Sequence, residues 1–202
     1  MRLNLPTRRG RADGFTLIEV LITIFITAIG LLTVAGLQAA SKKVNFETAQ
    51  RTSATALAQD MVERIRANPS AKVSYLTSDA TAAASATGCA ASSAACSSAD
   101  LAAYDVYQWG QKLLGAEEQD ASGNITGGLV NPTGCITYDA TNKVYRVAVA
   151  WRGYTALAAI PSTVPSNDPM RATCGNGLGR YTDPLTSGSN DLLRRLIVVE
   201  FI

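Results

Sequence analysis

Residues 8–20 read Arg8-Arg9-Gly10-Arg11-Ala12-Asp13-Gly14-Phe15-Thr16-Leu17-Ile18-Glu19-Val20. The stretch changes character at Gly14, because the residues before it are mostly basic or small and those after it are mostly apolar. A single carboxylate, Glu19, lies near the start of the apolar part. Basic residues directly before an apolar segment predict that the segment crosses a membrane with its N-terminus in the cytoplasm.

The apolar segment continues without a charge over the 18 residues 20–37. At about 1.5 Å per residue a helix of this length spans roughly 27 Å, close to the thickness of about 30 Å of a hydrocarbon core. We therefore expect a transmembrane part at about residues 15–38, with the remaining chain exported to the periplasm.

This segment also fits two other kinds of membrane-directed sequence. A secretory signal peptide would be cut at a small-residue site such as that near Ala35 or Ala39, but its apolar region usually has about 7 to 15 residues. A plain membrane anchor would let Glu19 reach the lipid headgroups. A carboxylate at the bilayer centre costs about 2.5 to 3.5 kcal/mol, and somewhat less toward the interface, so Glu19 indicates a partner instead.

The net charge of the chain is concentrated at its N-terminus. The formal net charge is +2, from 18 basic and 16 acidic side chains. Residues 1–14 hold four arginines and Asp13, a net charge of +3, which leaves 14 basic and 15 acidic side chains, or −1, in the rest. Without these residues the protein has no basic surface of the kind that phosphate groups require, and we predict no nucleic-acid partner.

Histidine is absent from the sequence. The chain therefore lacks the commonest general base and the commonest neutral metal ligand. It also lacks the Gly-x-Ser-x-Gly motif that would support an exported hydrolase on a membrane anchor. We predict a protein that is not an enzyme and that has no cofactor and no metal site.

Four cysteines, Cys89, Cys96, Cys135 and Cys174, follow the apolar segment, and none forms a Cys-x-x-Cys pair. An even number of cysteines in an exported, loop-rich domain favours disulfides. Pairing Cys89 with Cys96 and Cys135 with Cys174 is the simplest of the three connectivities, because each bond closes one loop. Four free, buried thiols are the alternative.

A helical spacing continues beyond Gln38, and we expect one helix from Phe15 to about Ala67, within a segment 15–68 that Asn68-Pro69 ends. Residues 70–99 are rich in Ala, Ser and Thr and are expected to form a surface loop. Asp100 is the expected N-cap of a helix that Gly115 ends. The apolar positions of the two helices are Ala54, Leu57, Ala58, Met61, Val62 and Ile65, and then Val106, Trp109 and Leu113.

Three strands are expected in the last third of the chain. Residues 135–138 and 144–151 predict a hairpin around the turn 139–142, and residues 196–202 predict a terminal strand. Alternation places Tyr145, Val147, Val149 and Trp151 on one face, and likewise Ile197, Val199 and Phe201. We predict an α+β fold in which a small antiparallel sheet packs on the second half of the long helix, with a globular head at 69–202 and a long excursion at 153–195 that Cys174 tethers.

The residues Gly14-Phe15-Thr16-Leu17-Ile18-Glu19-Val20-Leu21 resemble the prepilin signature of type IV pilins and type II secretion pseudopilins. The resemblance implies the type IV pilin fold and a leader peptide, residues 1–14, that a prepilin peptidase removes by cutting between Gly14 and Phe15. It also implies N-methylation of Phe15 and an ion pair between the new α-amine of Phe15 and Glu19 of a neighbouring subunit.

Further features resemble the PilV family of minor pilins. They are Arg64-Ile65-Arg66-Ala67-Asn68-Pro69, Tyr104-Asp105-x3-Trp109, Val147-Ala148-Val149-Ala150-Trp151 and Arg194-Arg195. This resemblance implies a minor pilin that, with other minor pilins, the major pilin and a tip adhesin, initiates pilus assembly and supports adhesion and twitching motility. The implied location is the inner membrane, with a single span and a periplasmic head, and then the pilus.

The sequence is also compatible with other functions. A minor pseudopilin of a type II secretion system shares the N-terminal signature, but Asp168, Asp183 and Asp191 are too scattered to suggest the calcium site of some pseudopilins. An adhesin or a DNA-uptake pilin would need exposed aromatic or basic side chains. The loop candidates are Tyr154, Arg180 and Tyr181, for which packing or solvation is the simpler role.

Overall fold

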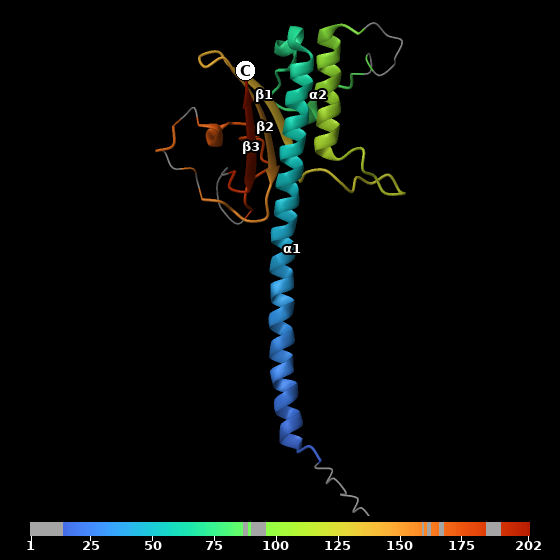
Figure 1. The fold of residues 1–202 in the computed structure, drawn as a ribbon, viewed down its shortest axis with the longest axis vertical. Coiled ribbons are helices and arrows are strands. Elements are labelled where there is room, and N and C mark those ends of the chain that lie inside the picture. Colours follow the sequence, from blue (N-terminus) through green and yellow to red (C-terminus); the bar gives the residue numbers. More distant parts are fainter. Residues whose placement is uncertain are drawn as a thin grey trace, which may run out of the picture. The chain divides into compact units, whose positions relative to one another are not determined.

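The computed structural model describes residues 14–86, 89, 96–158, 160, 163–165, 168–184 and 191–202. The elements, in chain order, are α1 (Leu17–Ala67), the 3₁₀ turns η1 (Pro69–Tyr75) and η2 (Ala80–Ala82), α2 (Ser98–Leu114), β1 (Thr133–Asp139), β2 (Val144–Arg152), η3 (Pro169–Arg171) and β3 (Arg194–Phe201). They are labelled, where there is room, in Figure 1. The chain divides into an N-terminal unit, Met1–Val44, and a head unit, Asn45–Ile202.

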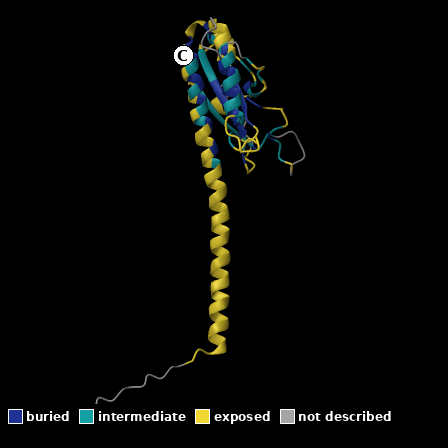
Figure 2. Cartoon of the chain, turned by 90° about the vertical axis from the view of Figure 1, so that its right-hand side faces the viewer, coloured by how far each residue is buried: buried dark blue, intermediate teal, exposed yellow. Residues whose placement is uncertain are grey.

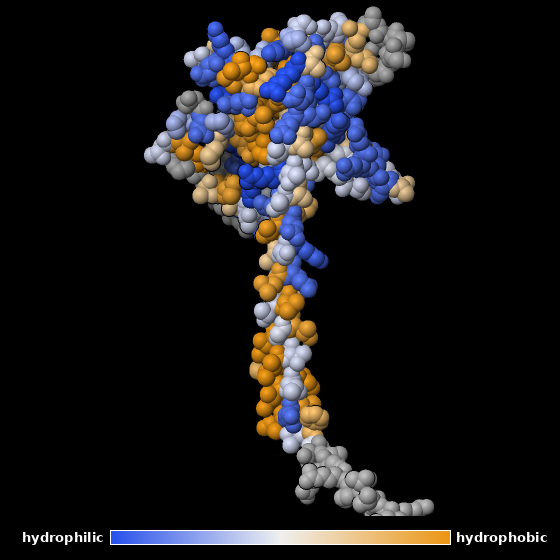
Figure 3. Space-filling view, in the orientation of Figure 1, coloured by the Kyte–Doolittle hydropathy of each residue, from blue (hydrophilic) through white to orange (hydrophobic). Residues whose placement is uncertain are grey.

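The N-terminal unit consists of the first part of α1 and the residues just before it. Its residues are exposed, as the colours of Figure 2 show, and their apolar side chains give this part of α1 the mainly hydrophobic surface seen in Figure 3. Within the residues that the structure describes, α1 is the one helix that is long and apolar enough to cross a membrane. The long N-terminal helix that the sequence predicts is confirmed.

The head unit contains a three-stranded antiparallel sheet in the order β1-β2-β3. Cys135 is paired with Ala148 between β1 and β2, and Val149 is paired with Ile197 between β2 and β3. The predicted hairpin and terminal strand are therefore present, although β1 and β3 each begin two residues earlier than the alternation indicates.

Helix α2 has well-defined caps at both ends. The hydroxyl of Ser97 accepts a hydrogen bond from the Asp100 N–H (3.1 Å), and the Asp100 carboxylate accepts one from the Ser97 N–H (3.4 Å). Asp100 is thus the third residue of the helix, at the second end of a capping box, and not the N-cap that the sequence indicates, because Ser97 caps the helix three residues earlier. At the other end Gly115 stops the helix, as predicted, with a left-handed φ of 75°.

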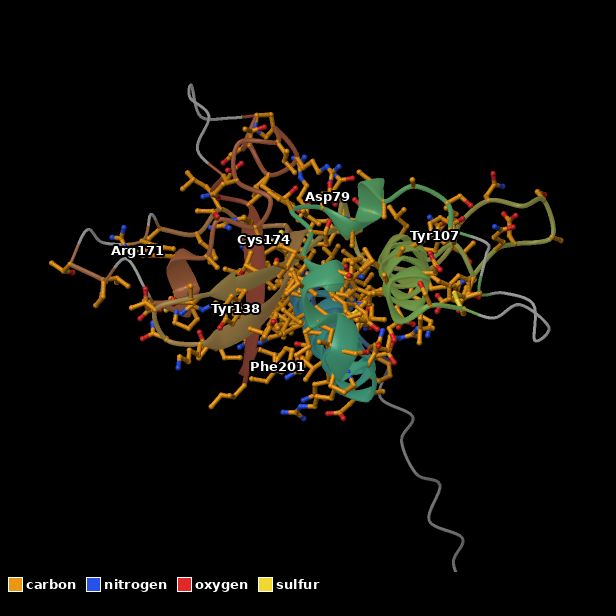
Figure 4. The ribbon with its side chains drawn as sticks, turned by 90° about the horizontal axis from the view of Figure 1, so that it is seen from above. Asp79, Tyr107, Tyr138, Arg171, Cys174 and Phe201 are labelled. Carbon is orange, nitrogen blue, oxygen red and sulfur yellow. A yellow bond between two sulfur atoms is a disulfide. The ribbon has the colours of Figure 1, made fainter. Side chains whose placement is uncertain are left out.

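The main core of the head unit lies between the sheet and the two helices, whose side chains meet in Figure 4. Trp109 is fully buried, and its indole N–H donates to the carbonyl of Leu57 (2.9 Å), which joins α2 to α1. The predicted apolar faces supply this core. It includes Ala54, Ala58, Met61, Val62 and Ile65 from α1, Val106, Trp109 and Leu113 from α2, and Val147, Val149, Trp151 and Phe201 from the sheet.

The segment 70–99 is partly buried, so the prediction of a surface loop was wrong for that part. Tyr75 at the end of η1 and Ala80 at the start of η2 are buried in the main core. A Cβ atom on Gly110 of α2 would overlap the backbone of Ala80, so the glycine lets η2 approach α2 closely. The prediction was wrong here because a single aromatic residue, without any periodicity, anchors the segment.

The opposite face of the sheet carries a second, smaller core. Cys135, Ala148, Ala150, Cys174 and Tyr181 are buried together there, and Leu196 and Val198 pack against them. The excursion between β2 and β3 supplies Cys174 and Tyr181. Both faces of the sheet are therefore covered, although the alternation in sequence indicates only one apolar face.

Candidate processing and assembly site

The residues at the start of the described chain are arranged around the first turn of α1. Gly14, Phe15 and Thr16 have no helical structure, and α1 begins at Leu17, two residues later than predicted. The Glu19 N–H donates to the Thr16 hydroxyl (3.3 Å) and carbonyl (3.1 Å), and the Val20 N–H donates to the Thr16 carbonyl (3.2 Å). Thr16 therefore has the position and the hydrogen bond of an N-cap, which sets the start of the helix.

The peptide bond between Gly14 and Phe15 lies outside the helix and is accessible. No described atom lies within 4 Å of the position that a Cβ on Gly14 would occupy, and Phe15 is 82% exposed. The part of the predicted leader before Gly14, residues 1–13, lies outside the described residues. What the structure describes is an uncovered glycine–aromatic bond directly before a membrane-type helix.

The hydroxyl groups of the apolar segment form hydrogen bonds within their own helix. Thr23 donates to the carbonyl of Val20 (2.8 Å), Thr27 to that of Thr23 (2.6 Å) and Thr33 to that of Ile29 (2.9 Å). In lipid such bonds satisfy the threonine hydroxyls without any neighbouring chain.

Glu19 is different. Among the described residues no side chain or backbone group bonds its carboxylate, which is exposed on the first turn of α1. The N-terminal end of the helix dipole favours a negative charge at this position but does not supply a countercharge. The arrangement therefore leaves one carboxylate, near the end of an apolar helix, that requires a cation from outside the described part of this unit.

The four cysteines are paired in the head unit. Disulfides join Cys89 to Cys96, with Cα atoms 5.6 Å apart, and Cys135 to Cys174, with Cα atoms 5.7 Å apart. These are the pairs that close the simplest loops. The second bond is buried in the smaller core, where it fixes the excursion between β2 and β3 to β1, and Figure 4 labels Cys174 beside the strands.

A buried polar network that sequence reasoning missed joins α1, η1 and α2. The Asp105 carboxylate accepts hydrogen bonds from Arg64 Nη1 (2.7 Å) and from the Tyr75 hydroxyl (2.7 Å). Asn68 donates to the Tyr75 hydroxyl (3.3 Å) and to the carbonyl of Ser98 (2.7 Å). Burial and the hydrogen bond to Asp105 raise the pKa of Tyr75 to about 12. Arg64, Asn68 and Asp105 of this network belong to the Arg64-to-Pro69 and Tyr104-Asp105 motifs, so these three motif residues have a packing role in this fold.

The loop residues considered as possible ligand contacts also have packing roles. Tyr181 is fully buried and shares a hydrogen bond with the Thr133 hydroxyl (2.7 Å). Arg180 forms an ion pair with Asp79 (3.0 Å), and the Tyr154 ring packs edge-on against that of Phe46, with centroids 5.2 Å apart. Among the described residues, no group of three or more Cys, Asp or Glu side chains is placed to hold a metal ion.

Comparisons with known families match two adjacent parts of the chain. The prokaryotic N-terminal methylation motif matches residues 9–35, and the family described as type IV pilin Tt1218 matches residues 36–107. No curated protein matches the chain. No solved structure matches it either. The first match covers the uncovered Gly14–Phe15 bond and Glu19, and the second covers the rest of α1 and much of α2.

With the long α1 and the small antiparallel sheet, these matches confirm the predicted α+β fold of a type IV pilin. They also support the assignment of the chain as a type IV pilin-like prepilin with a methylation motif and one apolar N-terminal helix.

Proposed function

We propose that this protein is a minor pilin of the type IV pilus, of the PilV type, made as a membrane-anchored precursor. A prepilin peptidase at the inner membrane cuts the bond between Gly14 and Phe15 and methylates the new N-terminus. Residues 1–14 leave as a basic leader, residues 15–38 stay in the membrane, and the head at 69–202 lies in the periplasm. The protein has no enzymatic role of its own.

The observation that carries this proposal is the carboxylate of Glu19, which has no partner within the part of the chain that the structure describes. Each threonine hydroxyl in the apolar segment takes part in a hydrogen bond within the helix, whereas Glu19 has no described partner. Cutting after Gly14 creates an α-amine at Phe15, a cation four residues before Glu19 in the sequence. The amine of one subunit pairs with Glu19 of the next, which makes the carboxylate tolerable in lipid and sets the position of each entering subunit.

The partners in this proposal are the peptidase, the other minor pilins, the major pilin and a tip adhesin. The head unit supplies the part of the subunit that meets them outside the membrane, and its motifs of the PilV type support this assignment. In this role the protein initiates the filament and remains at its tip, where adhesion and twitching motility depend on it.

The experiment is the substitution Glu19→Ala, with Thr23→Val as the matched control in the same helix. We expect both variants to insert in the membrane and to lose the leader. Glu19→Ala is expected to disappear from sheared pili, while Thr23→Val is recovered at the wild-type level, because the Thr23 hydroxyl already donates to the Val20 carbonyl of its own helix. Recovery of Glu19→Ala in pili at the level of Thr23→Val would refute the ion-pair role.

A further inference from the structure

Thr16 lies between the proposed cleavage site and the helix. Its hydroxyl and its carbonyl both accept a hydrogen bond from the Glu19 N–H, and its carbonyl is the first among the described residues to accept a hydrogen bond from α1. Gly14 and Phe15 consequently remain outside the helix. Proteases act on extended peptides, because in a helix the carbonyl of the scissile bond would be engaged by the N–H four residues later.

Without the Thr16 hydroxyl, the Glu19 N–H keeps only the Thr16 carbonyl, three residues upstream, and the first N–H groups of α1 gain acceptors when the helix extends upstream. These groups lie at the start of an apolar segment, where an unsatisfied N–H is costly, so the first turn does not simply open. The acceptors four residues upstream are the Phe15 carbonyl for Glu19 and the Gly14 carbonyl for Ile18. The second of these is the carbonyl of the bond to be cut. Losing the cap therefore favours a helix that includes the cleavage site.

We infer that Thr16 is a positioning residue for leader cleavage. Its side chain caps α1 so that the helix begins at Leu17, which keeps the Gly14–Phe15 peptide extended for the peptidase. The inference rests on the function proposed above. In the reaction one water molecule adds across this amide, so that Gly14 leaves as a carboxylate with the leader and Phe15 keeps the α-amine. Thr16 takes no part in the bond changes.

The expected effect follows from the strength of an N-cap. Loss of a threonine cap changes the helix equilibrium by a factor of about five. When only a fraction of the substrate molecules is extended at the cleavage site, the apparent affinity for the enzyme falls in proportion to that fraction, whereas the bound, extended form reacts as before. Removing the cap is therefore expected to raise KM by up to about fivefold and to leave kcat unchanged.

The test measures cleavage of the full-length precursor in detergent micelles by a purified prepilin peptidase. Thr16→Val keeps the shape of the side chain but removes the cap, whereas Thr16→Ser and Thr16→Asn keep a capping oxygen. Thr23→Val controls for the loss of a hydroxyl elsewhere in the helix. We expect the higher KM for Thr16→Val alone, with Thr16→Ser, Thr16→Asn and Thr23→Val equal to wild type.

Each contrary result has a distinct meaning. A wild-type KM for Thr16→Val would overturn the inference, and so would a Thr16→Asn variant as impaired as Thr16→Val, which would indicate direct recognition of the threonine by the peptidase. A loss in kcat rather than in KM would overturn it as well. If the wild-type precursor itself is not cut between Gly14 and Phe15, the proposed function fails, and the inference fails with it.

Discussion

Replacing Asp105 by alanine is expected to destabilise the head unit strongly. The Asp105 carboxylate is largely buried, with 11% of its side chain exposed, and it accepts 2.7 Å hydrogen bonds from Arg64 and from Tyr75. Its removal leaves a buried hydroxyl with a weaker partner and a guanidinium without its closest carboxylate. Breaking a buried ion pair of this kind typically costs about 3 to 5 kcal/mol.

The lower end of this range applies here for two reasons. The Arg64 side chain is 25% exposed, and it keeps a second carboxylate, Asp60, at 3.1 Å. We therefore expect a loss of about 3 kcal/mol in the free energy of unfolding. For a unit the size of Asn45–Ile202, a loss of 1 kcal/mol lowers Tm by about 2 to 4 °C, so the expected decrease is about 6 to 12 °C.

The assay is thermal unfolding of the full-length protein in detergent, followed by tryptophan fluorescence. Trp109 and Trp151 are both buried in the main core and report its loss. The control is Glu63→Gln, which removes the charge of an exposed pair with Arg66 and is expected to cost less than about 1 kcal/mol. A decrease in Tm for Asp105→Ala no larger than that for Glu63→Gln would show that the buried network does not hold α1, η1 and α2 together.

Two further predictions concern the same unit. Burial and a hydrogen bond to a carboxylate raise the pKa of Tyr75 to about 12, above the value of about 10 in the unfolded chain. The protonated Tyr75 hydroxyl therefore stabilises the fold fully below pH 10, and this stabilisation is lost as the pH rises to 12. Unfolding measured across this range should show that loss in the wild type and a smaller one in Tyr75→Phe; equal losses would exclude Tyr75 as their source. Replacing Cys135 and Cys174 together by alanine should cost about 4 kcal/mol, and replacing Cys89 and Cys96 about 2.5 kcal/mol, on a chain-entropy estimate from the 39- and 7-residue separations. Denaturant titration of the two double variants checks the order, which a larger loss for the Cys89 and Cys96 pair would contradict.

The parts of the fold that the sequence predicts are those with a clear period or a strong stop signal. Spacings of three and four from Ala54 to Ile65 predict the buried face of α1, and alternation from Tyr145 to Trp151 predicts the inner face of β2. Gly115 predicts the end of α2. In each case one local property of the chain determines the result, which is why no knowledge of distant contacts is needed.

The parts that sequence reasoning missed depend on contacts between distant residues. The hydroxyl of Tyr75 can be buried because it donates a hydrogen bond to Asp105, thirty positions later in the chain. The glycine at 110, inside an otherwise apolar helix face, is the signal that another backbone approaches α2, but it does not identify Ala80 as that neighbour. The second core behind the sheet likewise depends on a disulfide and on Tyr181, which alternation does not place.

At the candidate site, the motif from Gly14 to Glu19 identifies the residues, and the structure adds their arrangement. The helix begins at Leu17 and not at Phe15, because Thr16 supplies the cap. This difference of two residues separates the proposed cleavage bond from the helix. The structure also shows that the threonine hydroxyls of the segment form hydrogen bonds within the helix, which the motif does not predict. The Glu19 carboxylate differs from them because it has no such bond among the described residues.

The most direct test of the central claim is the mass of the mature protein, measured on the intact chain and on its N-terminal peptide after expression in cells that carry a type IV pilus system. We predict a protein that has lost residues 1–14 and begins with N-methylated Phe15. A chain that keeps its first 14 residues, or one cut near Ala35 or Ala39, would contradict the claim.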